Sequence, residues 1–188
     1  ISERTKLIVI TSPNNPTGVV YTKDSLEAVK KVALKHRIFI LSDDVYHQLV
    51  YTNDFHKLSD DPSIRHLLIV AQSYSKPYAM TGWRLGYMAA EKSIAQACDK
   101  IQGQFTSATS SISQRAAIAA LSKQTDDVKN MVEQFKIRRD HVVKMLNEIP
   151  GVKTNIPDGA FYVFPDISYY FGKSDGTTTI NDSNDLSM

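Results

Sequence analysis

The stretch Ser73–Tyr87, with the sequence SYSKPYAMTGWRLGY, decides the predicted fold. It follows an apolar run at 67–71, LLIVA, whose composition is typical of a buried strand. Polar loops that directly follow buried strands are common ligand-binding places in α/β proteins. Lys76, Ser73 and Arg84 are therefore candidates for a binding site. Taken alone, however, a loop lysine is more commonly a solvated surface residue, and a loop arginine a surface ion-pair partner.

Two further apolar runs precede this stretch. Residues 7–11, LIVIT, and 38–41, IFIL, are both predicted to be buried strands. Apolar residues recur at helical spacing between them, which predicts an amphipathic helix at 23–36 with Thr22 as its N-cap. A strand–helix–strand unit implies parallel pairing with a right-handed crossover, so the sequence predicts an α/β fold.

The remaining elements are predicted from the same kinds of pattern. We expect extended chain at 46–51, a polar loop at 52–63, and strands at 85–90 and 160–164. Helices are predicted at 91–104, 110–121 and 126–149, and loop or disorder from Gly172 onward.

Composition limits the classes of function. The formal charge of +2 arises from 22 basic and 20 acidic residues spread along the chain, which does not favour a nucleic-acid partner. No apolar run approaches the ~20 residues that cross a bilayer, so no membrane partner is expected. A single cysteine, Cys98, excludes an intrachain disulfide and favours a reducing compartment, the cytoplasm. The polar start, ISERTK, does not resemble a signal peptide, and we expect the chain to be a piece of a longer protein.

Three polar side chains follow the three predicted parallel strands: Asn15, Asp43 and Lys76. The carboxyl ends of parallel strands lie on one edge of a sheet, so these side chains can converge. Each has an ordinary alternative. Asp43 and Asp44 could cap a turn, and either Asn15 or its neighbour Asn14 could be only a turn residue.

The residues of these loops match the needs of a pyridoxal phosphate site. Such a site requires an amine for the aldehyde, an anion at the ring nitrogen, donors to the phenolate oxygen, and phosphate ligands. Tyr46 can donate to the phenolate oxygen, although alone it could be an ordinary half-buried aromatic residue. The predicted binding set for pyridoxal 5'-phosphate is Lys76 as the amine, Asp43 as the anion, Tyr46 and Asn15 as donors, and Ser73 and Arg84 as phosphate ligands.

Four stretches together make the sequence similar to a known family. SPNNPTGVVY (12–21), LSDDVYHQLVY (41–51), SYSKPYAMTGWRLGYM (73–88) and PDGAFYVF (157–164) resemble motifs of the class I and II aminotransferases of pyridoxal phosphate fold type I, particularly the bacterial aspartate aminotransferase branch. The resemblance implies Lys76 as the internal aldimine lysine and proton shuttle. It also implies Asn15 rather than Asn14, because the family's cofactor asparagine directly precedes Pro-Thr-Gly. The Asn15–Pro16 bond is then a candidate cis peptide.

The resemblance also implies a fold and a domain division. It predicts part of the large domain of a fold type I transferase, a mostly parallel sheet with helices on both faces, and the start of the small C-terminal α/β domain. The expected boundaries are 1–125 for the large domain, 126–171 for the long helix and the start of the small domain, and 172–188 for a loop or disordered tail. Proteins of this family are about twice as long, so we expect the missing parts to include further phosphate and substrate ligands. The fragment alone should then be inactive.

The implied function is transfer of an amino group between an L-amino acid, aspartate or another acidic or aromatic one, and a 2-oxo acid, by a homodimer. The alternatives are a C–S β-lyase or decarboxylase on the same fold, or a non-catalytic sensor domain of a transcription regulator. Other chemistries have little support. The five histidines lack metal-ligand spacing, and no GxGxxG, Walker or GxSxG motif is present.

Overall fold

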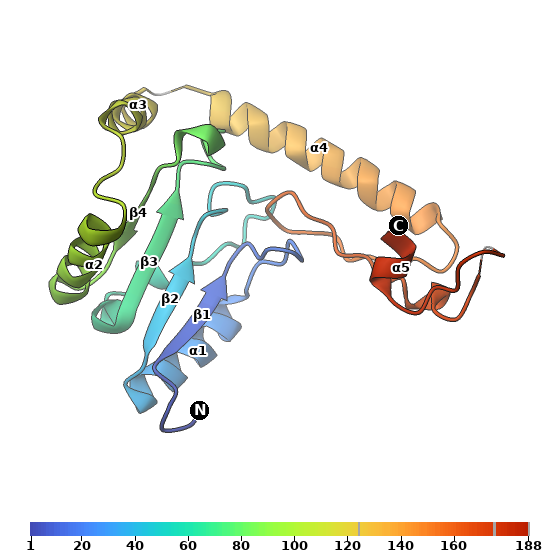
Figure 1. Cartoon of the computed structure of the whole chain (residues 1–188), viewed down its shortest axis with the longest axis horizontal. Coiled ribbons are helices and arrows are strands. Elements are labelled where there is room, and N and C mark those ends of the chain that lie inside the picture. The colour runs from blue at the N-terminus through green and yellow to red at the C-terminus, as the bar shows by residue number, and fades with distance from the viewer. Residues whose placement is uncertain (124, 175, 188) are drawn as a thin grey trace.

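The structure is a computed structural model that describes residues 1–123, 125–174 and 176–187. It contains one four-stranded sheet of β1 (Leu7–Thr11), β2 (Phe39–Asp43), β3 (Leu68–Ser73) and β4 (Gly86–Ala89), in that spatial order. β1, β2 and β3 are parallel, as the strand–helix–strand pattern predicted, and β4 pairs antiparallel with β3. The three parallel strands therefore present their carboxyl ends on one edge (Figure 1). The predicted α/β class is confirmed, with a mixed sheet.

The crossover between β1 and β2 is α1 (Lys23–His36), within the predicted bounds. Its N-cap is Thr22, whose hydroxyl accepts a hydrogen bond from the Ser25 backbone N–H at 3.2 Å. The apolar face of α1 buries Leu26 and Ala33 in the main core, where Ile40 of β2 has no exposed surface. The opposite face of β1 is open in the described part of the chain, because Val9 alternates to that side and stays 59% exposed.

Three longer helices follow the sheet: α2 (Lys92–Phe105), α3 (Ser111–Ser122) and α4 (Asp127–Glu148). α3 buries Ala117 against Tyr74, Met80 and Leu85, in a second, smaller core beside the loop that follows β3. α4 then runs from the edge of the sheet toward the C-terminal part of the chain, as Figure 1 shows. None of the described helices has both the length and the apolar character that a bilayer-spanning helix needs.

Two predicted extended segments, 46–51 in its first half and 160–164 throughout, are wrong. Residues 45–48 form a turn instead of extended chain, because the Asp44 and Tyr46 carbonyls accept hydrogen bonds from residues three positions on. Residues 160–164 form no strand, since the nearest bridges, Val50 with Gly159 and Lys153 with Asp166, lie on either side of this segment. The chain at 157–164 instead returns as a loop to the ends of β1 and β2 (Figure 1).

Smaller differences concern the connections. The predicted polar loop at 52–63 contains a 3₁₀ turn at Leu58–Asp60 and the start of another at Pro62–Leu67. The tail that was predicted as loop contains a short helix, α5 (Ser183–Ser187). Asp175 and Met188 of that tail lie outside the described residues. The division at 125 and 171 remains a prediction.

Candidate active site

The predicted site residues come from the loops at the carboxyl edge of the parallel strands. β1 and β2 end in register, with Thr11 opposite Asp43, and Asp43 lies opposite Ala71 of β3. Lys76 follows three residues after the end of β3, and Asn15 four residues after the end of β1. Sheet register therefore brings segments that are far apart in sequence to one edge, as Figure 1 shows.

The amine of Lys76 lies among aromatic rings. Its Nζ is 5.3 Å from the ring centre of Phe161 and 6.0 Å from that of Tyr46. The side chain is half-buried, and the neighbouring Pro77 is fully buried. An ammonium group over ring faces is stabilised electrostatically.

Tyr46 is the centre of this cluster. Only 4% of its surface is exposed, and its hydroxyl lies 2.5 Å from the Tyr162 hydroxyl. Burial raises the pKa of Tyr46, and so do the hydrogen bond with Tyr162 and the negative charge of Asp43, while a hydrogen bond with Asn15 acts in the opposite direction. Tyr46 is therefore protonated at neutral pH, as an unperturbed tyrosine also is, and it can donate a hydrogen bond to an anionic oxygen.

The Asn15 loop is held by its neighbour. The Asn14 side-chain oxygen accepts a hydrogen bond from the Thr17 hydroxyl at 2.8 Å, and the Asn14 carbonyl accepts from the Gly18 N–H at 2.8 Å. Asn14 is thus occupied as a turn residue, whereas Asn15 is exposed and its side chain interacts with Tyr46. The Asn15–Pro16 peptide is cis, as predicted, and so is Ser12–Pro13.

The two aspartates after β2 differ in environment. Asp43 is half-buried, and its Oδ1 accepts a hydrogen bond from the Val45 N–H at 3.3 Å. Asp44 is 3% exposed, and one of its oxygens accepts a hydrogen bond from the Ser42 hydroxyl at 2.6 Å. Because alternate residues point to opposite faces of a strand, Ser42 and Asp44 share the buried face and Asp43 points away from it. Asp43 is the carboxylate whose charge acts on Tyr46.

Ser73 and Arg84 lie where β3 and β4 meet. Ser73 pairs with Gly86, two residues after Arg84, and the Ser73 hydroxyl donates to the Leu85 carbonyl at 3.3 Å. Arg84 is exposed in the left-handed region, with φ 50°, and its Nη1 donates to the Thr81 carbonyl at 3.0 Å. A guanidinium has five N–H donors, so this bond leaves donors that could hold a phosphate.

The loop at 157–164 adds two residues that the sequence analysis did not assign to the site, Phe161 and Tyr162. The Phe161 ring contacts Lys76, and its centre is 5.5 Å from that of Tyr46 at 83°. The stretch PDGAFYVF had marked this loop as a family motif, but its place after α4 gave no reason to bring it to the sheet edge. The adjacent aromatic residues Phe161 and Tyr162 were the one local feature of the sequence that could have indicated a place in the site.

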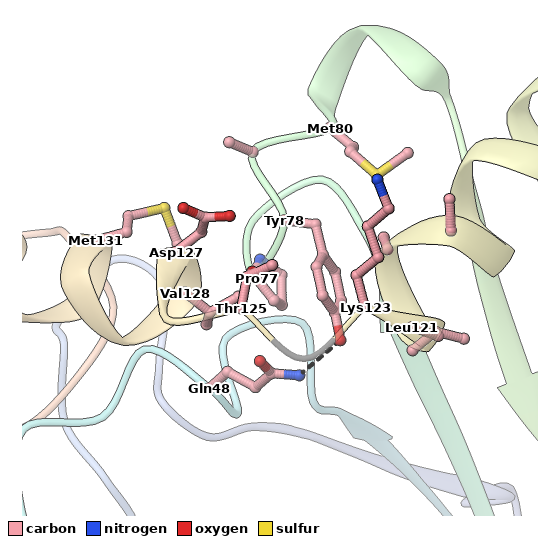
Figure 2. A pocket seen from close by; sticks show the side chains of 13 residues that line it. Gln48, Pro77, Tyr78, Met80, Leu121, Lys123, Thr125, Asp127, Val128 and Met131 are labelled. Carbon is pink, nitrogen blue, oxygen red and sulfur yellow. Dashed lines mark hydrogen bonds between the residues drawn. The ribbon is translucent and has the colours of Figure 1, made fainter.

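A separate cavity of about 580 Å³ lies beside the site, between the loop at 77–80, the end of α3 and the start of α4 (Figure 2). Its wall includes Gln48 and Tyr78, whose side chains are linked by a long hydrogen bond of 3.5 Å. None of the six predicted site residues lines this cavity, so it is distinct from the predicted cofactor site. Within the described residues, no cluster of three or more His, Cys, Asp or Glu side chains could hold a metal ion.

The chemistry of the clustered groups fits pyridoxal phosphate. One amine, one carboxylate, one protonated phenol and one amide approach each other around Tyr46, and a hydroxyl and a guanidinium lie at the neighbouring junction of β3 and β4. This set supplies each kind of group that the cofactor requires.

Comparison with known proteins gives the family. The sequence profile of the aminotransferase class I and II family matches residues 1–179. A bifunctional aspartate aminotransferase and glutamate/aspartate-prephenate aminotransferase of Petunia hybrida is 43% identical over 99% of this chain and 40% of its own length. An aspartate/prephenate aminotransferase of Cereibacter sphaeroides is also 43% identical, over 93% of this chain and 44% of its own length.

The fold agrees with the sequence comparison. The crystal structure of the aspartate aminotransferase of Rhizobium meliloti superimposes with a TM-score of 0.93 at 35% identity, covering 99% of this chain and 48% of that one. This chain thus spans less than half the length of these relatives. Since the family profile covers nearly all of it, the chain belongs to the class I and II aminotransferases, as the four sequence motifs implied.

Proposed function

We propose that the full-length protein is a pyridoxal-phosphate-dependent aminotransferase that moves an amino group between an L-amino acid and a 2-oxo acid. The observation that carries this proposal is the position of Lys76 Nζ beside Tyr46, whose hydroxyl also interacts with Asn15 and with the charge of Asp43. Family membership supports the same reaction. The names of the relatives favour aspartate as the amino donor, and the petunia protein's name makes prephenate a candidate acceptor.

Each residue has a role that follows from its chemistry. When bound, the cofactor supplies an aldehyde for the amine and a ring that withdraws electrons from the substrate carbon. Lys76 would hold it through Nζ. The Nζ amine, when free and unprotonated, would take the proton from the substrate Cα and return it to a neighbouring carbon. The rings of Phe161 and Tyr46 lie beside this amine, with centres 5.3 and 6.0 Å from Nζ.

The other residues hold the ring and phosphate. Asp43 would accept a hydrogen bond from the protonated ring nitrogen, and its negative charge keeps that nitrogen protonated. Tyr46 and Asn15 would donate to the phenolate oxygen. Ser73 and Arg84 would bind the phosphate, Arg84 through the N–H groups that the Thr81 carbonyl leaves free.

The test is a visible absorption spectrum of the full-length protein with pyridoxal phosphate, recorded before and after addition of aspartate. We expect a band of bound cofactor that disappears with aspartate, is absent in Lys76→Ala, and is unchanged in Lys100→Ala, which alters an exposed lysine on α2. A band that aspartate leaves unchanged would favour another donor, the lyase or decarboxylase alternative, or the sensor alternative. Absence of any band would contradict the proposal.

The remaining expectations are also proposals. A homodimer and a cytoplasmic location are predicted for the full-length protein, the location from the presence of a single cysteine, Cys98. The isolated chain of 188 residues is expected to show no turnover. Measurable transamination by residues 1–188 alone would refute that expectation.

A further inference from the structure

Tyr162 is a residue of the site for which the family motifs suggested no role. Its hydroxyl lies 2.5 Å from that of Tyr46, although the two residues are 116 positions apart in sequence. Their rings meet edge to face, with centres 5.6 Å apart at 80°. This contact joins the loop after α4 to the turn after β2.

The loop that carries Tyr162 is fixed from several directions. The Ala160 N–H donates to the Leu49 carbonyl at 2.8 Å, and the Tyr51 hydroxyl donates to the Ala160 carbonyl. From α4, Arg139 Nη1 donates to the Pro157 carbonyl at 2.6 Å. The backbone that leads into Tyr162 is therefore held by contacts at Pro157 and Ala160 that do not involve the Tyr162 hydroxyl.

The direction of this contact depends on where the single proton of Tyr46 points, because either hydroxyl can be the donor. A phenol has one proton to donate and an oxygen that accepts up to two hydrogen bonds. Around Tyr46 the possible donors are the amide of Asn15 and the hydroxyl of Tyr162. Without cofactor, the Tyr46 hydroxyl can donate to Tyr162, the direction in which this bond raises the pKa of Tyr46. When the single proton of Tyr46 is donated to the cofactor, as proposed above, the 2.5 Å contact can only be a bond that Tyr162 donates.

We propose that Tyr162 is a positioning residue that donates its proton to the Tyr46 oxygen and thereby directs the Tyr46 proton at the phenolate oxygen of the cofactor. This inference rests on the proposed function. Hydrogen bonds in a chain polarise one another, so a Tyr46 that accepts from Tyr162 is a stronger donor than one that does not. Tyr162 thus acts through Tyr46 and needs no contact with the cofactor.

The consequence is a shift in the titration of the bound cofactor. A donor at the phenolate oxygen draws electron density from it and so weakens its hold on the proton of the adjacent nitrogen bound to Lys76. Loss of the Tyr162 hydroxyl weakens this donor, and the midpoint pH of the visible band should rise by about half a unit, about threefold in the proton equilibrium. The other charged groups near this cluster are Asp43, Lys76 and, from α4, Arg138 and Arg139.

The experiment is a cycle of four full-length proteins loaded with pyridoxal phosphate: wild type, Tyr162→Phe, Tyr46→Phe and the double variant. Tyr162→Phe keeps the ring and removes only the hydroxyl. Tyr170→Phe is the matched control, because its hydroxyl donates to the Pro150 carbonyl at 2.7 Å, outside the site. For each protein the visible band is titrated with pH, and cofactor affinity is measured by equilibrium binding.

We expect Tyr162→Phe to raise the midpoint in the wild-type background, to add nothing in the Tyr46→Phe background, and Tyr170→Phe to leave the midpoint unchanged. Equal shifts in both backgrounds would overturn the inference, because Tyr162 would then act independently of Tyr46. So would an unchanged midpoint in Tyr162→Phe with cofactor bound. A wild-type protein that forms no band refutes the proposed function itself, which separates that failure from the failure of this inference.

Discussion

Gly18 contacts the 157–162 loop, and we call these contacts the Gly18 junction. Replacing Gly18 with alanine should weaken this junction, which holds the loop at the site. The Gly18 carbonyl accepts hydrogen bonds from the N–H groups of Asp158 and Gly159, at 2.9 and 3.0 Å. A Cβ at position 18 would lie 2.4 Å from the Pro157 Cβ and 3.1 Å from the Tyr162 carbonyl oxygen. Gly18 also has φ +70°, a conformation that strains any residue with a Cβ.

Both costs can be given a magnitude. The left-handed backbone costs a non-glycine residue about 1–2 kcal/mol. Overpacking against the rigid ring of Pro157 costs about 1–3 kcal/mol. Gly18→Ala should therefore lower the free energy of unfolding by about 2–5 kcal/mol. The same displacement would move Phe161 and Tyr162 away from Lys76, so affinity for pyridoxal phosphate should fall as well.

Alanine substitutions at three other glycines allow the backbone cost and the packing cost to be measured separately. Gly172 has φ +80° with open space around it, so Gly172→Ala should carry only the backbone cost. Gly159 has no positive φ, but its Cβ would lie 2.4 Å from Pro13 Cγ, so Gly159→Ala should carry only the packing cost. Gly82→Ala has neither, and should change stability by less than about 0.5 kcal/mol.

The measurement is chemical denaturation of the four full-length variants beside the wild type, together with cofactor binding. The expected order of destabilisation is Gly18 first, Gly159 and Gly172 in between, and Gly82 last. Only Gly18→Ala and Gly159→Ala should weaken cofactor binding, because Gly172 lies outside the junction. If Gly18→Ala matches Gly82→Ala in both measurements, the junction does not hold the loop and the reasoning is refuted.

Three further predictions concern stability and pH. Thr22→Ala removes the cap of α1 and should cost about 1 kcal/mol in denaturation experiments, whereas Ser110→Ala, at an N-cap without a side-chain hydrogen bond, should cost less. Asp61 has a pKa lowered to about 2, chiefly by its hydrogen bond with Lys30, so its contribution to stability is present above pH 4 and is lost between about pH 4 and 2. Asp61→Asn should abolish that loss in acid titrations of the unfolding midpoint. Asp44 has a pKa raised mainly by burial, so the wild type should lose stability as pH rises from about 4 through that raised pKa, and Asp44→Asn should not. A variant that follows the wild-type pH curve at either aspartate would contradict the corresponding assignment.

Much of the fold was predictable because local patterns decide it. The strands at 7–11 and 39–43 are short apolar runs, and α1 has both a helical apolar period and a cap at Thr22. Once these elements are known to be parallel, the carboxyl ends of the strands must share an edge, which is how Asp43 and Lys76 were selected. This part of the site follows from chain geometry without any knowledge of α4.

The strand prediction at 160–164 was wrong because contacts between aromatic rings take the place of strand pairing there. The apolar stretch at 160–164, AFYVF, has the composition of a strand, but none of these residues forms a β-bridge; the neighbouring bridges are Val50 with Gly159 and Lys153 with Asp166. Phe161 instead packs against Phe135 of α4 and against Tyr46, with ring centres 5.4 and 5.5 Å away. A propensity pattern shows that the side chains are apolar and aromatic, but not whether their partners are strands or single rings.

The contacts of this loop also bear on the predicted domain division. A boundary near 125 assigns residues 157–162 to the second domain, yet these residues complete the surroundings of Lys76 in the first. The loop is tied to both parts, since Arg139 of α4 holds the Pro157 carbonyl while Gly18 and Leu49 hold the loop from the sheet side. The backbone at Asp43 belongs to β2 and that at Lys76 directly follows β3, so both are placed in the chain by the sheet. We infer that the site has a fixed half on the sheet and an aromatic half whose position depends on α4, so that a displacement of α4 would reach the Lys76 amine through Phe161 and the Tyr46 proton through Tyr162.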